Sequence, residues 1–380
     1  MFKKELIDKV YAYSIKDDDS LMFKDVDNIY HNPFNEKEFK IYGSGIIDKE
    51  KSFHRFTSED IKNIGNVSQD VMWLATHSSG IQIHFKTNSR LITLRVLENG
   101  VFDMKNLNFF AQCGFDLYYK EDGVYKFHNI AFPNYIDRKK FISNIGVFRE
   151  TKEREIIINL PLYIGVESLE IGLEKDSYAL PTYYKNNGKI LCYGTSILQG
   201  CGASRPGLSI TNVVSRFFDI DTLNYGFSGA GLLEKEVGSI IAKVDDVKLL
   251  IIDAEANAGC DKWMVNNFDD FINEFYKKYP NLAVILMNKS KMSIDSYLPR
   301  NKMMKVFNDK FLKSRVNKYR KLNKEIYFIN NYDLFSKDEI LDESEFTVDG
   351  VHPNDLGMTL LSKNYIKAIK NVKSLKSVMF

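Results

Sequence analysis

Ser196 is the residue whose type and place in the chain best suit nucleophilic chemistry. It stands in the segment KILCYGTSILQG at residues 189–200, where a short apolar run passes into a helix-like stretch. This pattern predicts a serine hydroxyl at the carboxyl edge of a parallel sheet, the side on which α/β folds place their sites. The backbone N–H of Ser196 would join the helix N-terminus, which favours negative charge. A serine at such a turn is also an ordinary helix N-cap, so Ser196 alone defines no function.

His352 is a candidate partner for this serine. Of the six histidines in the chain, it is the one that follows Ser196, and it stands in the segment FTVDGVHPND three residues after Asp349. An aspartate placed so on a tight loop can accept the imidazole Nδ1–H, which leaves Nε2 free to take a proton from a serine. Ser196, His352 and Asp349 therefore form a candidate catalytic triad. The alternative for this loop is a surface turn before a helix.

Two further loops after predicted strands offer hydrogen-bond donors. The segment NYGFSGAG contains Gly229, whose bare backbone N–H can face an oxyanion, and DAEANAGCD contains Asn257, whose side-chain amide can donate. Together with the Ser196 N–H, these groups would form an oxyanion hole for a tetrahedral acyl intermediate. Glycine and asparagine are also common in ordinary turns, which is the alternative for both loops.

Arg205 and Trp263 are candidates for a substrate pocket. Arg205, in the segment GASRPG, could contact an anionic or hydroxylated substrate, or it could lie at a domain interface. Trp263 could line an acyl or sugar pocket, or it could pack the start of a helix. No His or Cys pair stands at helical spacing to bind a metal, and no phosphate-binding glycine loop follows a strand. We therefore expect no metal site.

The elements that must position these residues differ between two parts of the chain. Residues 70–174 contain short segments of alternating polarity separated by turn residues, which predict antiparallel strands and a β-sandwich of jelly-roll-like type. After residues 184–189, apolar strands alternate with helical segments, which predicts a parallel sheet flanked by helices. We expect two domains, residues 1–187 and 188–380. The predicted strands of the first part are VMWLAT, IQIHFKT, LITLRVL, GFDLYYK, VYKFHNI, REIIINL and SLEIGL.

Composition narrows the possible functions. The 380 residues are 44% hydrophobic and 27% charged, and 52 basic against 50 acidic residues give a net charge of +2, so no basic field favours nucleic acid. The apolar run at residues 282–287 is far shorter than the roughly 20 residues of a membrane span. The N-terminal segment lacks the apolar region of a secretory signal, and four cysteines make no disulfide framework, so we expect a cytoplasmic protein. The 13% aromatic content suits β-structure and sugar-contacting surfaces.

The ordered blocks GTS, GFSGAG, DAEAN and DGVH resemble the SGNH (GDSL-type) hydrolase family. The resemblance is closest to the subgroup in which a β-domain with a Gly-x-Asp-Leu-Tyr signature precedes the α/β domain, and that signature stands here as GFDLY at residues 114–118. It implies a flavodoxin-like three-layer α/β/α fold, Ser/Asp/His chemistry, ester substrates, and no metal or organic cofactor. The chain departs from the family at Thr195, where Asp is usual, and in its third block, which lacks the Gly-x-Asn-Asp form.

These observations predict a serine esterase that acts on O-acyl groups, with O-acetyl groups on a carbohydrate as expected substrates. The partner would be a small-molecule or glycan ester, with no nucleic acid and no membrane involved. An acyltransferase with the same triad and a non-catalytic carbohydrate-binding protein are the alternatives. The sequence does not indicate the acyl group, the alcohol or the oligomeric state.

Overall fold

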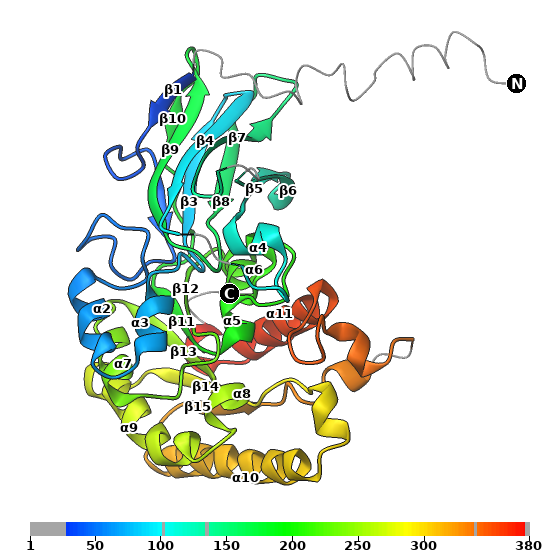
Figure 1. Cartoon of the computed structure of the whole chain (residues 1–380). Coiled ribbons are helices and arrows are strands. Elements are labelled where there is room, and N and C mark those ends of the chain that lie inside the picture. The colour runs from blue at the N-terminus through cyan, green and yellow to red at the C-terminus, as the bar shows by residue number, and fades with distance from the viewer. Residues whose placement is uncertain (1–27, 101–102, 134–136, 338–339, 377–380) are drawn as a thin grey trace, which may run out of the picture.

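The structure, a computed structural model, describes residues 28–100, 103–133, 137–337 and 340–376. Antiparallel strands form one part of the molecule, and a parallel sheet with helices on both faces forms the other (Figure 1). This arrangement confirms the predicted fold class.

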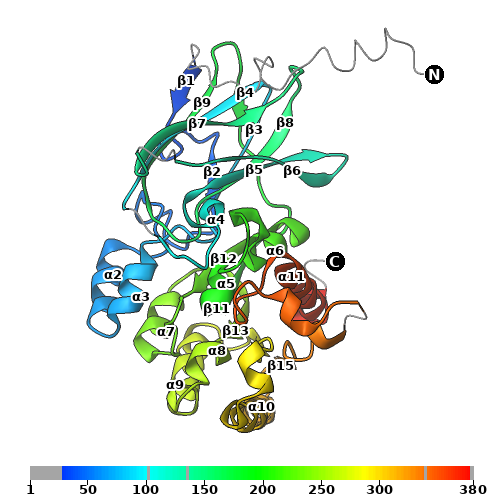
Figure 2. The ribbon, with the colours of Figure 1, turned by 45° about the vertical axis from the view of Figure 1, so that its right-hand side comes forward.

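Two antiparallel sheets make up the N-terminal sandwich (Figure 2). Ile83 and Phe85 of one sheet and Ile92 and Leu94 of the other are fully buried in a single cluster between the sheets. The alternation of these apolar residues along each strand explains why one face of each sheet is buried. The first sheet has the order β1 (Asn28–His31), β9 (Val166–Glu174), β4 (Leu91–Glu98) and β7 (Lys140–Val147). The second has the order β10 (Ala179–Leu180), β3 (Gln82–Thr87), β8 (Arg154–Asn159), β5 (Phe115–Glu121) and β6 (Val124–Ala131), and β2 (Lys40–Tyr42) pairs with β3.

The C-terminal sheet has five parallel strands in the order β12, β11, β13, β14, β15. This is the flavodoxin-like order 2-1-3-4-5 that the family resemblance implied. Leu191 and Tyr193 of β11 are buried with α7, α9 and α10 on one face, and Ile190 and Cys192 are buried with α6 and α11 on the other. The strands are β11 (Lys189–Gly194), β12 (Asp221–Gly226), β13 (Val247–Asp253), β14 (Ala283–Met287) and β15 (Ile326–Ile329). The helices are α5 (Ser196–Gln199), α6 (Ile210–Phe218), α7 (Lys235–Ile241), α8 (Glu255–Ala258), α9 (Trp263–Lys278), α10 (Pro299–Lys321) and α11 (Asp355–Lys370).

The segment VMWLAT was expected to be a strand, and this prediction is wrong. It lies in helix α3 (Gln69–Ala75), which follows α2 (Ser58–Gly65) and begins where the Ser68 side chain accepts a hydrogen bond from the Val71 N–H. Val71 and Leu74, three residues apart, are buried against the C-terminal sheet together with α7, and both views show these helices beside α7 (Figures 1 and 2). The expected boundary between residues 187 and 188 separates the two antiparallel sheets from the parallel sheet. Helices α2 and α3 precede this boundary in sequence, but they pack against the parallel sheet of the C-terminal part.

The carboxylate of Asp116, in the GFDLY segment, joins the two halves. Its side chain is fully buried and accepts hydrogen bonds from the Gly207 N–H at 2.7 Å, from Arg205 Nη1 at 3.1 Å and from Asn159 Nδ2 at 2.6 Å. The Arg205 guanidinium also donates to the Tyr118 hydroxyl. Strand β5 is thereby fixed to the loop that follows α5.

Replacing Asp116 with alanine should destabilise the protein by about 3 kcal/mol, because Arg205 and the Gly207 N–H would lose a buried acceptor. Thermal unfolding followed by circular dichroism measures this change. The matched control is Asp176→Ala on the exposed surface, which should stay within about 0.5 kcal/mol of the natural protein. Equal shifts of the melting temperature in the two variants would contradict the role of Asp116 in joining the two halves.

Candidate active site

Ser196 lies at the carboxyl end of the first strand of the parallel sheet. Strand β11 ends at Gly194, Thr195 is the N-cap residue, and Ser196 is the first residue of α5 with 7% of its surface exposed. The Thr195 side chain makes no capping hydrogen bond, and the turn is closed by backbone groups: Gln199 N–H donates to Thr195 O at 3.0 Å and Cys201 N–H to Ser196 O at 2.9 Å. The loop is therefore closed by backbone hydrogen bonds although Thr195 replaces the usual Asp.

The structure brings Ser196, His352 and Asp349 into one hydrogen-bonded chain. Ser196 Oγ lies 2.9 Å from His352 Nε2, and His352 Nδ1 lies 2.8 Å from Asp349 Oδ2. Because an ionised Asp349 can only accept, the imidazole proton sits on Nδ1 and Nε2 is free to accept from the serine hydroxyl. These distances are within the range required for general-base activation of a nucleophile.

The carboxylate of Asp349 is surrounded by donors. Its Oδ1 accepts the backbone N–H groups of Val351 at 3.0 Å and His352 at 2.8 Å, and its Oδ2 accepts His352 Nδ1 and the Asn106 side-chain amide at 2.9 Å. Partial burial by itself raises the pKa of Asp349, but the hydrogen bonds from Asn106 and His352 outweigh it and hold the pKa well below its usual range. Asp349 therefore stays ionised at neutral pH.

The loop that carries Gly229 is fixed from both halves of the chain. Gly229 has φ +68°, in the left-handed region, and a Cβ there would meet open space, so the backbone angle is what favours glycine. The preceding Ser228 N–H donates to Gln199 Oε1 at 2.9 Å, and Gln199 Nε2 donates to Leu162 O at 3.1 Å. Arg55 Nη1 donates to Gly226 O at 2.6 Å at the start of the loop.

Asn257 reaches the same loop, but its amide does not have the predicted arrangement. Asn257 Nδ2 donates to Phe227 O at 3.2 Å and to Ala230 O. An amide has two N–H donors, and carbonyls on either side of Gly229 take both of them. In this geometry Asn257 braces the Gly229 loop rather than offering a free donor.

The two predicted pocket residues have different outcomes. Arg205 lies at the interface between the halves, where it pairs with Asp116 and its guanidinium stacks 3.9 Å over the Phe127 ring. Its position therefore agrees with the alternative drawn from the sequence, a residue at a domain interface. Trp263 stands 48% exposed at the first residue of α9, and its part in a pocket stays a prediction.

Two residues near the site were not predicted from the sequence. Asn106 donates to Asp349 across 243 positions of sequence, so no local pattern indicates it. Gly202 has φ +96°, and a Cβ there would lie 2.0 Å from the carbonyl oxygen of Pro353, the residue after His352. The glycine-rich segment after Ser196 is the signal that could have indicated Gly202.

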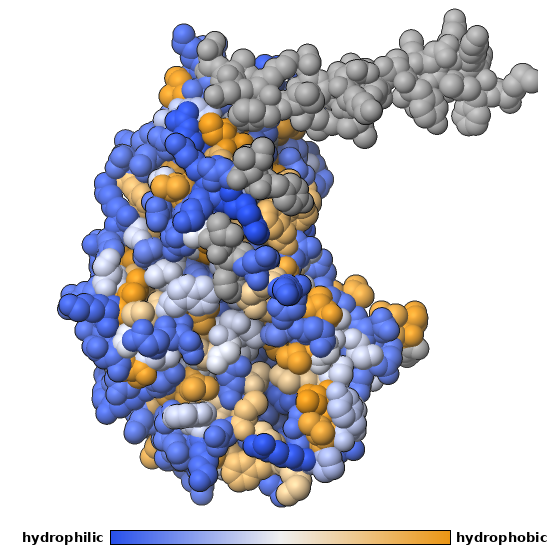
Figure 3. All heavy atoms as spheres, in the orientation of Figure 1, coloured by the Kyte–Doolittle hydropathy of each residue, from blue (hydrophilic) through white to orange (hydrophobic). Residues whose placement is uncertain are grey.

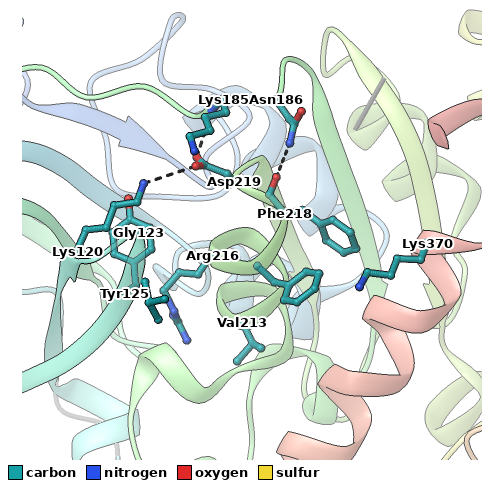
Figure 4. Close-up of a pocket in the computed structure, with 12 residues that line it drawn as sticks. Lys120, Gly123, Tyr125, Lys185, Asn186, Val213, Arg216, Phe218, Asp219 and Lys370 are labelled. Carbon is teal, nitrogen blue, oxygen red and sulfur yellow. Dashed lines mark hydrogen bonds and ion pairs between the residues drawn. The ribbon is translucent and has the colours of Figure 1, made fainter. Parts of the chain in front are cut away.

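A groove of about 750 Å³ lies elsewhere, between the sandwich and the C-terminal helices. Figure 4 shows Lys120 and Tyr125 on one side and Arg216, Asp219 and Lys370 on the other. Arg216 and Phe218, in the second half of helix α6, line this groove, and β12 begins shortly after α6, at Asp221. The groove therefore borders the amino edge of the sheet, opposite the edge that carries Ser196. It is therefore separate from the hydrogen-bonded chain of Ser196.

On the face drawn in Figure 3, hydrophobic residues form small groups among hydrophilic ones. Within the described ranges, no helix combines the length and apolar character needed to cross a membrane. The expected cytoplasmic location stays a prediction.

Comparison with known proteins identifies the family. The GDSL-like lipase/acylhydrolase family matches residues 187–370, and the GxDLY family, the N-terminus of SGNH-hydrolase-type esterases, matches residues 29–178. A GDSL-like lipase from Bacteroides ovatus ATCC 8483 is 30% identical, with 92% of this chain and 98% of that chain covered and a TM-score of 0.81. The chain belongs to the SGNH-type, GDSL-like family of esterases. The family resemblance drawn from the sequence is thus confirmed.

Less similar structures share the fold of this SGNH-type esterase. A salicylyl-acyltransferase from a tetracycline biosynthetic pathway is 14% identical, with 92% of this chain and 99% of that chain covered and a TM-score of 0.72. An acetyl xylan esterase from the rumen bacterium Butyrivibrio proteoclasticus is 12% identical, with 90% and 98% covered and a TM-score of 0.55. No curated protein matched the sequence.

Gly202→Ala should lower the esterase rate on the order of 100-fold, because the added Cβ pushes the Pro353 carbonyl, and with it the His352 loop, away from α5. Hydrolysis of p-nitrophenyl acetate measures the rate. Gly123→Ala is the matched control, since Gly123 has φ +78° but open space around its Cβ position in the β5–β6 turn. The control should lose roughly 1 kcal/mol of stability and keep its rate. Similar rates in both variants would rule out the close approach as the cause.

Proposed function

We propose that this protein hydrolyses O-acyl esters through Ser196, His352 and Asp349, with O-acetyl groups on a carbohydrate as its substrates. The observation that carries the proposal is the hydrogen-bonded chain from Ser196 Oγ through His352 to Asp349 at the carboxyl edge of the sheet. The chemistry needs no metal or organic cofactor.

In the first half of the reaction, Ser196 Oγ attacks the ester carbonyl while His352 Nε2 takes its proton. Asp349 orients the imidazole and stabilises the imidazolium. The tetrahedral intermediate then collapses, the alcohol leaves with the proton from His352, and an acyl-enzyme remains. Water attacks the acyl group with His352 again acting as base, which releases the acid and restores the serine.

The oxyanion of both tetrahedral intermediates would be bound by backbone N–H groups. The Ser196 N–H stands at the N-terminus of α5, and the Gly229 N–H belongs to the neighbouring loop. Asn257 fixes the direction of the second donor through its bonds to the carbonyls of Phe227 and Ala230. Direct donation by Asn257, as expected from the sequence, would require the amide to leave one of these carbonyls.

Two observations support a carbohydrate ester as substrate. Solved carbohydrate esterases, among them the acetyl xylan esterase, have the same fold. The aromatic content of 13% suits contacts with sugar rings. The acyltransferase with this fold makes transfer to an alcohol the second candidate.

Ser196→Ala should keep the fold and lower the hydrolysis of acetylated xylo-oligosaccharides and of p-nitrophenyl acetate by roughly three or more decades. The same variant should no longer be labelled by a fluorophosphonate, because the probe reacts with the activated hydroxyl. Product analysis and intact mass spectrometry measure the two effects.

The control is Ser204→Ala, since Ser204 follows α5 and its backbone N–H donates to Asp355 Oδ1 at 2.8 Å. Near-natural turnover in Ser196→Ala would exclude Ser196 as nucleophile. New esters formed when alcohols are added would favour acyl transfer, and unlabelled natural protein would favour a carbohydrate-binding protein.

Asn257→Ala should lower kcat on the order of 100-fold with little change in KM, because the Gly229 donor acts on the transition state. Asn257→Asp should be at least as damaging, since a carboxylate cannot donate to the carbonyls of Phe227 and Ala230. Steady-state kinetics and thermal unfolding of both variants provide the measurement. A lower melting temperature at unchanged kcat would assign Asn257 to the turn alone.

A further inference from the structure

The acidic member of the proposed triad is held from the N-terminal half of the chain as well as from its own turn. Of the four hydrogen bonds to the Asp349 carboxylate, three come from Val351 and His352 in that turn. The fourth comes from Asn106, whose Nδ2 lies 2.9 Å from Asp349 Oδ2, the oxygen that also accepts His352 Nδ1.

The loop that presents Asn106 is anchored on both sides of it. The buried side chain of Gln112 accepts from the Met104 N–H at 2.9 Å and donates to Met104 O at 3.1 Å and to Leu107 O at 3.0 Å. Leu107 is 5% exposed and lies in the same buried cluster as Ile197, the residue after the serine. Gln112 itself belongs to α4 (Phe109–Cys113), the helix that follows the loop. The main chain at Asn106 is thus fixed although the side chain is exposed.

The hydrogen bond from Asn106 matters for the orientation of the Asp349 carboxylate, because Asp349 lies on a surface turn. Its side chain is 27% exposed, so packing alone does not fix the plane of the carboxylate and water competes for its oxygens. Each carboxylate oxygen accepts about two hydrogen bonds, and the Asn106 amide fills the last place. Only the amide nitrogen can face this carboxylate, since the amide oxygen would be repelled.

We propose that Asn106 is a positioning residue of this esterase, which keeps the Asp349 carboxylate aligned with His352 Nδ1. The inference rests on the proposed triad, in which that alignment holds Nε2 towards Ser196. It makes the N-terminal half a part of the catalytic machinery, because this half supplies the donor that completes the acid's hydrogen bonding. Asn106 touches no reacting atom and acts through Asp349.

The test compares Asn106→Ala and Asn106→Asp in the full chain, with Lys105→Ala as the control on the exposed neighbouring residue. Asn106→Ala should lower kcat for p-nitrophenyl acetate about 5-fold to 10-fold, with KM and melting temperature unchanged. Asn106→Asp should lower kcat on the order of 100-fold, because it sets a second carboxylate against Asp349. If the substitutions only disordered the loop, KM would rise or the melting temperature would fall. The loss of kcat would then not be larger in Asn106→Asp than in Asn106→Ala.

The rate of fluorophosphonate labelling separates this inference from the proposed function. Labelling of the natural protein but not of Ser196→Ala supports the nucleophile, and slower labelling of both Asn106 variants than of Lys105→Ala supports positioning. Equal labelling and equal kcat in Asn106→Ala and Lys105→Ala would overturn the inference while leaving the nucleophile in place. Natural protein that is not labelled at all would overturn the proposed function and this inference with it.

Discussion

A buried carboxylate at the interface, that of Asp116, links the two halves of this molecule. Asp116 accepts from the Gly207 backbone, from Arg205 and from Asn159, and its side chain is fully removed from water. Burying a charge is unfavourable unless it is paired and hydrogen-bonded, so the sandwich and the loop after α5 must meet in this one geometry to satisfy it. The loop so fixed follows directly on the helix that begins with Ser196. The Asp of the GFDLY signature thus has a physical role that does not require contact with substrate.

A buried arginine from the N-terminal half reaches a second loop of the proposed active site, the one that carries Gly229. Arg55, 1% exposed, donates to Asn224 O and Gly226 O and lies 4.7 Å from the centre of the Phe227 ring. Burial lowers the pKa of Arg55 to about 9, which reflects the unfavourable desolvation that its carbonyl contacts must offset. These contacts fix the start of the Gly229 loop. Arg55 lies between β2 and α2, so both the sandwich, through Asp116, and the segment that follows β2 fix loops at the proposed catalytic edge.

The proposed triad combines local and long-range order. The turn from Asp349 to His352 orients itself, because the acid accepts backbone N–H groups two and three residues ahead of it. Placing that turn beside Ser196 needs tertiary contacts, among them the close passage of Gly202 under Pro353. A well-formed turn that stood 1 Å away would lose most of its ability to accept the serine proton.

The sequence by itself indicated most of the strands, most helices and the identity of the triad candidates, but it did not indicate β1 or β7. Apolar alternation in β3, β4 and β5 and the buried runs of β11 and β13 are local signals, and so is the three-residue spacing of Asp349 and His352. It did not determine α3, because the apolar residues of VMWLAT suit a strand until Ser68 caps a helix and the C-terminal sheet buries one face. Nor could it decide the partners of Arg205, Asn257 and Asn106. Each of these side chains bonds to groups far away in sequence, and only the folded chain brings their donors and acceptors within about 3 Å of one another.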